Sequence, residues 1–324
     1  MSVENNKVSR RHLGIYGVLL SSLVIPFAMT LSTVHKTMTP PSFMDNPSPY
    51  GYTMSLLIFV VPILYFVVWL CKNPQYRIER NAFIGSVAGV FVLGSFLDFV
   101  FGYSFFYFPN RGAVLGLYLP SFSFSEWRWI PHYLPIEEFG FYLLGSTYML
   151  ASYLWGVLFW FKRYNHADHQ KACLSVDRML KVSYPLFFLG ISLFILGLVI
   201  KHLGPYPDGF PGYFTFMIFM MFLPCIFLFE SLRFLINWRA FTFMSFVLLL
   251  VSIVYEATLG VPYGWWKYHN DQMLGILIHA WSDLPIEAVC LWVAAGFGTV
   301  LLFEALRYYF YIGKPILRAF LGDK

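Results

Sequence analysis

Acidic residues are rare in the apolar stretches of this 324-residue chain, yet five of them stand in two similar patterns. The first pattern is LDFVFGYSFFYFPN (97–110) followed by LPIEEF (134–139), and the second is YEATLGVPYGWWKYHN (255–270) followed by LPIEAV (284–289). The acids are Asp98, Glu137, Glu138, Glu256 and Glu287. A carboxyl group in a dry site can donate a proton to a substrate and later accept one. The two patterns therefore favour acid–base chemistry in a buried site.

Composition places these acids in an integral membrane protein. The chain is 58% hydrophobic and 12% charged, with a mean hydropathy of +0.63, whereas soluble domains are about half apolar and a quarter charged. A charged residue deep in a membrane span costs about 2.5–3.5 kcal/mol, so such residues face a cavity or a partner. We therefore expect the five acids to share a cavity.

The elements that must position these acids are helices long enough to cross a bilayer, which takes about 20 apolar residues. Eight runs qualify: 13–32, 51–71, 82–104, 134–161, 184–201, 213–232, 240–261 and 283–306. We do not expect the first to be a cleaved signal peptide, because it is a full span and further spans follow it. The pattern predicts an all-α membrane protein of about eight transmembrane helices.

Basic residues predict the orientation of these spans, because they accumulate on the cytoplasmic side. With a cytoplasmic N-terminus and eight spans, only five of the 22 Lys and Arg residues fall outside: Lys36, Arg111, Arg128, Lys201 and Lys267. Both termini are therefore expected to be cytoplasmic. The net charge of +5 suits anionic lipid headgroups and needs no nucleic-acid partner.

The chain also contains an internal repeat. Aligning Asp98 with Glu256 also aligns Gly102 with Gly260, and a two-residue insertion then sets FYFPN opposite WKYHN. The predicted units are a first four-helix repeat (1–161), a charged cytoplasmic linker (162–182) and a second four-helix repeat (183–324). Repeats with an even number of spans insert in the same direction and are related by an axis along the membrane normal. All five acids would then lie at one depth, toward the outer face.

A simpler interpretation of the Pro-x-Glu motifs is a helix start. Pro135 and Pro285 suit a first helical turn, where acids also interact favourably with the helix dipole. This interpretation leaves Asp98 and Glu256 unexplained, because they lie near the opposite ends of their helices. Glu230 with Arg233, and Glu304 with Arg307, are i,i+3 neighbours, and we interpret them as interfacial pairs outside the site.

Aromatic residues surround the acids in both halves. The candidate substrate-binding residues are Tyr107, Trp127, Trp129, Phe139, Tyr142, Trp265, Trp266, Tyr268 and Trp281. Membrane proteins carry aromatic belts at their interfaces, which is the simpler explanation for any one of them. Together with dry carboxylic acids, however, ring faces suit the stabilisation of a carbocation through cation–π attraction.

These motifs resemble the lycopene cyclase domain of the heterodimeric and fused carotenoid cyclases of bacteria, archaea and fungi. The resemblance covers the third, fourth, seventh and eighth spans and includes NWRAF (237–241), LGLYLP (115–120) and LGILIH (274–279). It implies a terpenoid isomerase in a bacterial or archaeal cell membrane that closes a linear carotenoid end group into a ring. It also implies a long-chain isoprenoid or carotenoid substrate and partners among the other carotenoid-pathway enzymes.

The resemblance also implies catalytic roles for Glu137, Glu138 and Glu287. Protonation of an alkene needs a carboxylic acid that stays neutral until it reacts, and burial favours the neutral form. Neighbouring helix residues diverge by about 100°, so Glu137 and Glu138 cannot make the same contacts. One would protonate the substrate. The other, or Glu287, would hold the proton network or later accept a proton from the cation. Asp98 and Glu256 would tune and reprotonate the donor.

Other chemistries have weaker motifs or none. The chain has no DDxxD-like magnesium cluster, no GxGxxG after a strand and no histidine cluster within the spans, and its four cysteines are scattered. We therefore expect neither a metal nor a cofactor. The stretch GVPYGWWKY (260–268) also resembles a segment of membrane carotenoid hydratases. A hydratase and a proton-coupled transporter remain the alternatives, the latter requiring acids near the bilayer midplane.

Overall fold

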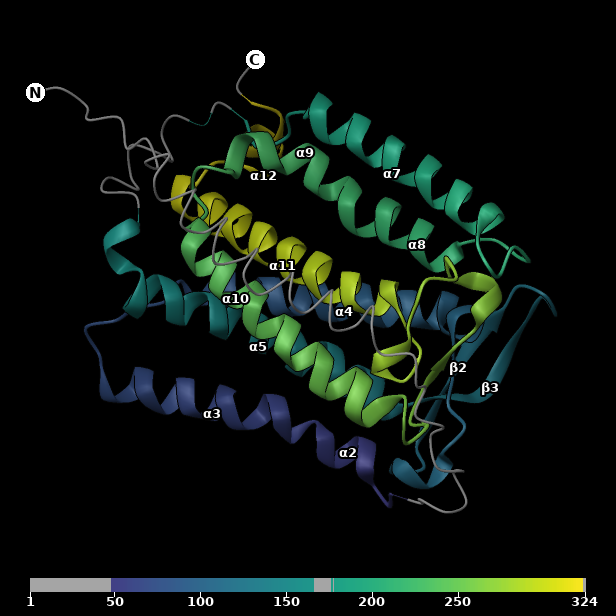
Figure 1. Ribbon diagram of the computed structural model, residues 1–324. Coiled ribbons are helices and arrows are strands. Elements are labelled where there is room, and N and C mark those ends of the chain that lie inside the picture. The colour runs from purple at the N-terminus through teal and green to yellow at the C-terminus, as the bar shows by residue number, and fades with distance from the viewer. Residues whose placement is uncertain (1–47, 166–175, 177, 323–324) are drawn as a thin grey trace, which may run out of the picture.

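The structure is a computed structural model that describes residues 48–165, 176 and 178–322, and it is a bundle of helices that run roughly side by side (Figure 1). Its α-helices are α2 (Gly51–Ser55), α3 (Leu57–Lys72), α4 (Arg80–Phe105), α5 (Ile136–Trp155), α7 (Tyr184–Leu203), α8 (Gly212–Phe216), α9 (Leu223–Leu232), α10 (Trp238–Ser252), α11 (Ile286–Ile312) and α12 (Ile316–Leu321). The π-helical segments Gly156–Trp160, Met217–Phe222 and Ile253–Gly260 follow α5, α8 and α10.

Within the described residues, six helical stretches are long and apolar enough to cross a membrane. They are Gly51–Lys72, Arg80–Phe105, Ile136–Trp160, Tyr184–Leu203, Trp238–Gly260 and Ile286–Ile312, and they coincide with six of the predicted runs. The predicted first span, 13–32, lies outside the described residues, as does part of the predicted linker. The predicted sixth span, 213–232, is a succession of α8, a π-helical segment and α9 instead of one regular helix. These apolar helices are compatible with a membrane protein.

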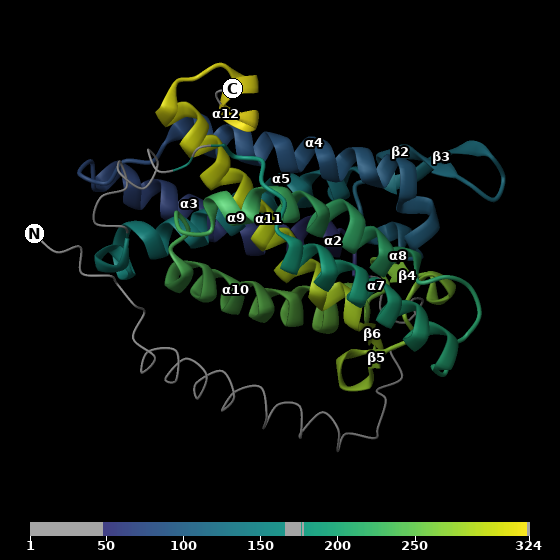
Figure 2. The ribbon, with the colours of Figure 1, turned by 90° about the horizontal axis from the view of Figure 1, so that it is seen from above.

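Helices α5 and α11 form the centre of the bundle. They pack against each other, and α4 and α10 each pack against both of them. Helix α3 covers α5 on one side, while α9 covers α11 on the other and α7 lies outside α9 (Figures 1 and 2). Among the 18 most apolar consecutive residues of Ile136–Trp160, 56% are buried. The same share is 17% in Gly51–Lys72, which contains α3, and 17% in Tyr184–Leu203, which is α7. The two outer helices therefore present most of their apolar surface outward, as a lipid-facing helix does.

Short strands gather at one end of the bundle, here called the hairpin end. Strands β2 (Tyr118–Ser123) and β3 (Arg128–Pro135) form a hairpin. Strand β1 (Phe106–Tyr107) pairs antiparallel with β4 (Lys267–Tyr268), and β5 (Leu277–Ile278) pairs with β6 (Leu284–Pro285). The β1–β4 pair joins the ends of the α4 and α10 stretches, and it thereby brings the two acid-containing patterns together.

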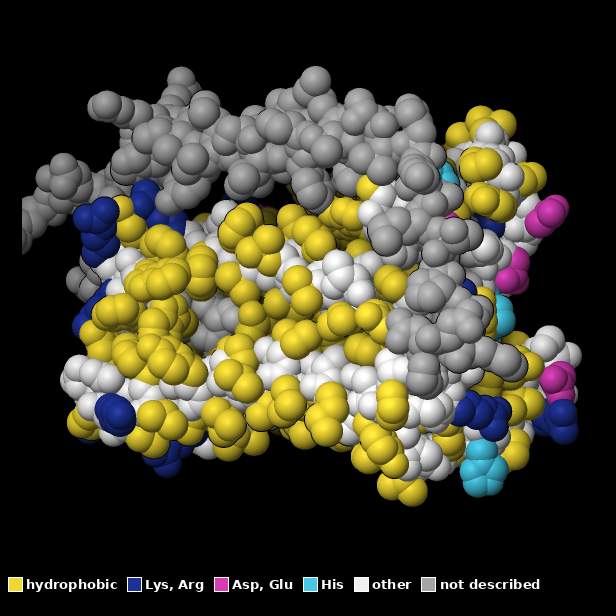
Figure 3. Space-filling model, turned by 60° about the horizontal axis from the view of Figure 1, so that its bottom comes forward, with side chains coloured by type: hydrophobic (Ala, Val, Ile, Leu, Met, Phe, Trp, Pro, Cys, Tyr) yellow, Lys and Arg dark blue, Asp and Glu magenta, His cyan; other side chains and the backbone are white. Residues whose placement is uncertain are grey.

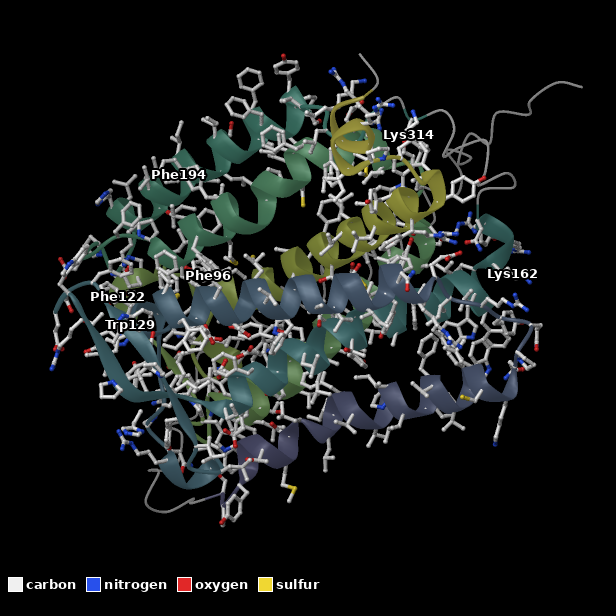
Figure 4. All side chains as sticks on the ribbon, turned by 180° about the vertical axis from the view of Figure 1, so that it is seen from behind. Phe96, Phe122, Trp129, Lys162, Phe194 and Lys314 are labelled. Atoms are coloured by element: carbon white, nitrogen blue, oxygen red, sulfur yellow. The ribbon has the colours of Figure 1, made fainter. Side chains whose placement is uncertain are left out.

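The face of the molecule shown in Figure 3 has an apolar middle and charged ends. Figure 3 shows hydrophobic side chains along the helices, Lys and Arg at one end, and acidic, basic and His side chains at the other. Figure 4 places Lys162 and Lys314 at the end opposite Phe122 and Trp129, which belong to the hairpin end. A body of this kind matches the apolar core and polar faces of a bilayer.

Candidate active site

A cavity of about 150 Å³ lies near the hairpin end, between α4, α5, α11 and the π-helical segment Ile253–Gly260. Among the described residues, its polar lining is dominated by three acids and five tyrosines: Asp98, Glu138, Glu256, Tyr52, Tyr142, Tyr213, Tyr255 and Tyr268. The rest of the lining is mostly aromatic and aliphatic, and it includes Phe141, Trp266 and Trp292. Three of the five predicted acids therefore meet in one apolar cavity.

Glu138 reaches this cavity from the first turn of α5, which begins directly after Pro135. Its Oε1 atom accepts a hydrogen bond of 2.6 Å from the hydroxyl of Tyr52. The adjacent Glu137 has different contacts: its Oε1 accepts hydrogen bonds from Thr53 Oγ1 at 2.6 Å and from the backbone N–H of Leu115 at 2.7 Å. Only Glu138 of this pair lines the cavity.

Glu137 and Glu287 make matching contacts at the starts of α5 and α11. Glu287 Oε1 accepts a hydrogen bond from the backbone N–H of Leu274, just as Glu137 does from Leu115. In addition, the backbone N–H at the start of each helix donates to the preceding loop, Ile136 to Leu117 and Ile286 to Ile276. Neither acid lines the cavity. Both hold a loop of the hairpin end against a first helical turn.

Asp98 lies in the last two turns of α4 and faces Tyr142 of α5. Its Oδ2 atom is buried and has no hydrogen-bond partner among the described residues. Gly94, one turn earlier, allows the close approach of Tyr142, because a Cβ atom there would lie 2.6 Å from the ring. Asp98 also interacts electrostatically with Glu138. Asp98 and Glu138 therefore line the same cavity, and Asp98 has an unpartnered oxygen.

Glu256 is held by hydrogen-bond donors on both of its oxygens. Oε2 accepts from Trp266 Nε1 at 2.8 Å and from the Tyr268 hydroxyl at 2.9 Å, and Oε1 accepts from Trp292 Nε1 at 3.2 Å. Burial, together with the adjacent Glu256 carboxylate, raises the pKa of Tyr268 well above its usual value. Tyr268 therefore stays a donor, and indole N–H groups can only donate. Glu256 therefore has the hydrogen-bond donors around it that are expected for a proton acceptor.

Glu256 lies in the π-helical segment Ile253–Gly260. Tyr255 and Glu256, both from this segment, line the cavity. Segments with π-helical geometry are rare and often occur at functional sites. Gly260 ends this segment against the ring of Trp266, where a Cβ atom would overlap the indole. The small residue therefore lets Trp266 reach Glu256.

The predicted substrate-binding aromatics fall into three groups. Tyr142, Trp266 and Tyr268 line the cavity. Phe139, Trp265 and Trp281 are buried but do not line it, whereas Tyr107, Trp127 and Trp129 are exposed at the hairpin end. Trp127 is 75% exposed and Trp129 is 54% exposed. The exposed group has the position of an interfacial belt.

Sequence reasoning missed three tyrosines of the cavity: Tyr52, Tyr213 and Tyr255. Two of them had a usable signal. Gly51-Tyr52 opens the predicted second span, and Gly212-Tyr213 lies at the start of the sixth, which is the corresponding span of the second half. The same dipeptide at equivalent positions extends the internal similarity beyond the acid motifs.

The two predicted acid–base pairs outside the site are present. Arg233 lies 3.2 Å from Glu230, and Arg307 lies 3.4 Å from Glu304. Glu304, however, is only 1% exposed and accepts a hydrogen bond of 2.9 Å from the Tyr153 hydroxyl. It is therefore a buried link between α11 and α5 and not an interfacial group.

Comparisons with known proteins return no match: no family model, no curated protein and no solved structure matches the chain. The described residues contain no group of three or more His, Cys, Asp or Glu side chains that could hold a metal ion. The chemistry of the cavity, together with the motif resemblance, is therefore the basis for a functional hypothesis.

Proposed function

We propose that this protein is a membrane-embedded enzyme that isomerises the linear end group of a long isoprenoid, such as a carotenoid, into a ring without redox change. The observation that carries the proposal is the convergence of Asp98, Glu138 and Glu256 in a cavity whose other walls are mainly aromatic and aliphatic. Such walls accept a hydrocarbon end group, and the acids can supply and recover a proton.

The first step is protonation of the terminal double bond. A carboxylic acid serves this step if it holds its proton until the alkene arrives, and an apolar cavity shared with a second acid favours that neutral form. Tyr52 fixes the orientation of Glu138. The carboxyl O–H bond breaks, the π pair of the alkene forms a C–H bond, and a carbocation remains on the substrate. Glu138 is the proposed donor, with Asp98 as its partner.

The second step is ring closure followed by proton loss. The π pair of a second double bond attacks the cation and forms the new C–C bond. The rings of Trp266, Tyr255 and Phe141 stabilise the positive charge through cation–π attraction. A carboxylate then takes a proton from the carbon next to the new cation, and the C–H pair becomes the ring double bond. Glu256, held by three donors, is the proposed acceptor.

The tandem-repeat architecture and the orientation belong to the same proposal. The β1–β4 pair, the matching loop contacts of Glu137 and Glu287, and the symmetric packing of α4 and α10 on α5 and α11 all support two parallel four-helix repeats. The Lys and Arg residues opposite the hairpin end support cytoplasmic termini.

The test is incubation of membranes that contain the protein with unlabelled lycopene in deuterated water. A pigment of unchanged formula that carries solvent deuterium at the ring is the expected product, measured by chromatography and mass spectrometry. The matched control is the Glu138→Gln variant at equal membrane abundance. Unchanged lycopene, or cyclisation without deuterium, argues against the proposal.

Hydration is the second candidate, and two hydrogen bonds favour it. Trp266 and Tyr268, both from the stretch that resembles carotenoid hydratases, donate hydrogen bonds to Glu256 in the cavity. A carboxylate at this position could equally activate a water molecule for attack on the cation. The same experiment separates the two candidates, because a hydratase yields a product heavier by one water.

A further inference from the structure

Another cavity, of about 620 Å³, adjoins the cavity that Asp98, Glu138 and Glu256 line, which is called here the acid cavity. The larger cavity is called here the outer cavity, and its lining includes the polar residues Ser104, Ser125, Thr215, His269, Asp271 and Gln272. Ser125 is exposed, so the outer cavity reaches the surface. Water that enters the outer cavity can therefore hydrogen-bond to this polar lining.

The two cavities have three lining residues in common: Phe101, Phe105 and Phe216. The three rings contact one another, with centroid distances of 5.8 Å for Phe101–Phe105, 5.7 Å for Phe101–Phe216 and 5.6 Å for Phe105–Phe216. They form a continuous wall from α4 and α8. Tyr213 supports Phe105 at 5.2 Å, and Phe124 supports Phe101 at 5.5 Å.

We propose that this phenylalanine wall keeps the water of the outer cavity away from the acid cavity, and thereby makes the carbocation lose a proton instead of gaining water. The chemical part of this inference rests on the proposed function. With the wall closed, a C–H pair becomes the double bond and its proton passes to a carboxylate. With the wall open, a lone pair of water forms a C–O bond, the water proton passes to the carboxylate, and an alcohol results.

Access through the wall is tested without any substrate. Gly145 lines the acid cavity, and a Cβ atom there would meet no atom within 4 Å, so a Gly145→Cys thiol has room. The experiment uses membrane vesicles and a protein in which Cys71, Cys173, Cys225 and Cys290 are replaced. A charged methanethiosulfonate should label the Gly145→Cys thiol about tenfold faster when Phe105→Ala is also present, because a closed apolar site protects a thiol. A Ser125→Cys thiol in the outer cavity should be labelled with and without Phe105→Ala. A Leu64→Cys thiol on the outward face of α3 should be labelled in neither case.

The chemical consequence is tested on the products. Phe105→Ala and, as a second opening in a less buried position, Phe216→Ala should each raise the fraction of alcohol among the products about tenfold. Phe96→Ala, on the outer surface of the same helix α4 (Figure 4), is the control and should leave it unchanged.

Two results would overturn the inference: labelling of Gly145→Cys with the wall intact, or an unchanged alcohol fraction in variants whose thiol is labelled. If the wild-type protein isomerised no isoprenoid, that result would contradict the proposed function and not the barrier role of the wall. The labelling rates would still decide whether the wall is a barrier.

Discussion

The hydroxyl of Tyr52 donates a hydrogen bond of 2.6 Å to Oε1 of Glu138, although 86 positions separate the two residues. This contact ties α2 to the first turn of α5. The Tyr52 ring is itself fixed, because it stacks on Trp265 at 6.3 Å and packs against Trp266 at 5.0 Å. The orientation of the proposed proton donor therefore depends on a residue outside both acid motifs.

Tyr52→Phe should lower turnover while leaving the fold intact. The variant keeps the ring and its stacking but removes the hydroxyl that orients Glu138. We expect kcat to fall roughly tenfold, equivalent to about 1.4 kcal/mol, with little change in KM, because the hydroxyl faces the acid and not the bulk of the substrate. The control is Tyr65→Phe on the outer face of α3. An unchanged kcat, or a change confined to KM, would count against the positioning role.

Glu138→Gln and Glu137→Gln should differ sharply in turnover. Glutamine retains a carbonyl oxygen, so the hydrogen bonds that each Oε1 accepts can persist in both variants. Only Glu138 lines the cavity, and loss of its acidic proton should reduce turnover by about 10²–10⁴-fold, the usual contribution of a general acid. Glu137→Gln should stay close to wild type. Initial rates at matched protein levels measure both.

A further variant separates the structural role of Glu137 from catalysis. Glu137→Ala removes the acceptor for Thr53 and for the N–H of Leu115, and should lower the free energy of unfolding by about 1–3 kcal/mol. Thermal unfolding in detergent measures this loss. Equal losses of turnover in Glu137→Gln and Glu138→Gln would mean that the proton is shared more widely than the cavity geometry indicates.

Sequence alone could predict the spans and the grouping of the acids, but not their individual roles. The thickness of the bilayer sets the length of an apolar run, which is why six predicted spans coincide with helices. The choice between Glu137 and Glu138 depends on how α5 is rotated against its neighbours, and rotation follows from packing that no single motif encodes. Trp127 and Trp129 lie in or beside the strands of a projecting hairpin, so their distance from the cavity could not be foreseen.

Gly260→Ala should displace Trp266 and weaken the site around Glu256. A Cβ atom at this position would overlap the indole ring, so the ring must move and its N–H must leave Glu256. We expect turnover to fall roughly tenfold and the free energy of unfolding to fall by about 1–3 kcal/mol, as for other overpacked sites. Gly298→Ala on α11 is the matched control, because a Cβ atom there would meet nothing within 4 Å. Wild-type turnover in Gly260→Ala would show that Trp266 is dispensable.

Tyr153→Phe should destabilise the protein without altering its chemistry. The Tyr153 hydroxyl donates to Glu304 at 2.9 Å and accepts from the backbone N–H of Asn237 at 3.1 Å, and Asn237 in turn caps α10 by accepting from the N–H of Ala240. Removing the hydroxyl leaves a buried carboxyl and a buried N–H each short of a partner, which costs about 1–3 kcal/mol.

Thermal unfolding should therefore occur at a lower temperature in Tyr153→Phe, while kcat at a permissive temperature stays at the wild-type value, because Tyr153 does not line the cavity. Tyr184→Phe, on the exposed side of α7, should change neither quantity. A fall in kcat with unchanged unfolding would instead connect the Tyr153–Glu304 link to proton delivery, since a chain of hydrogen bonds serves catalysis only if its loss slows the reaction in a folded protein.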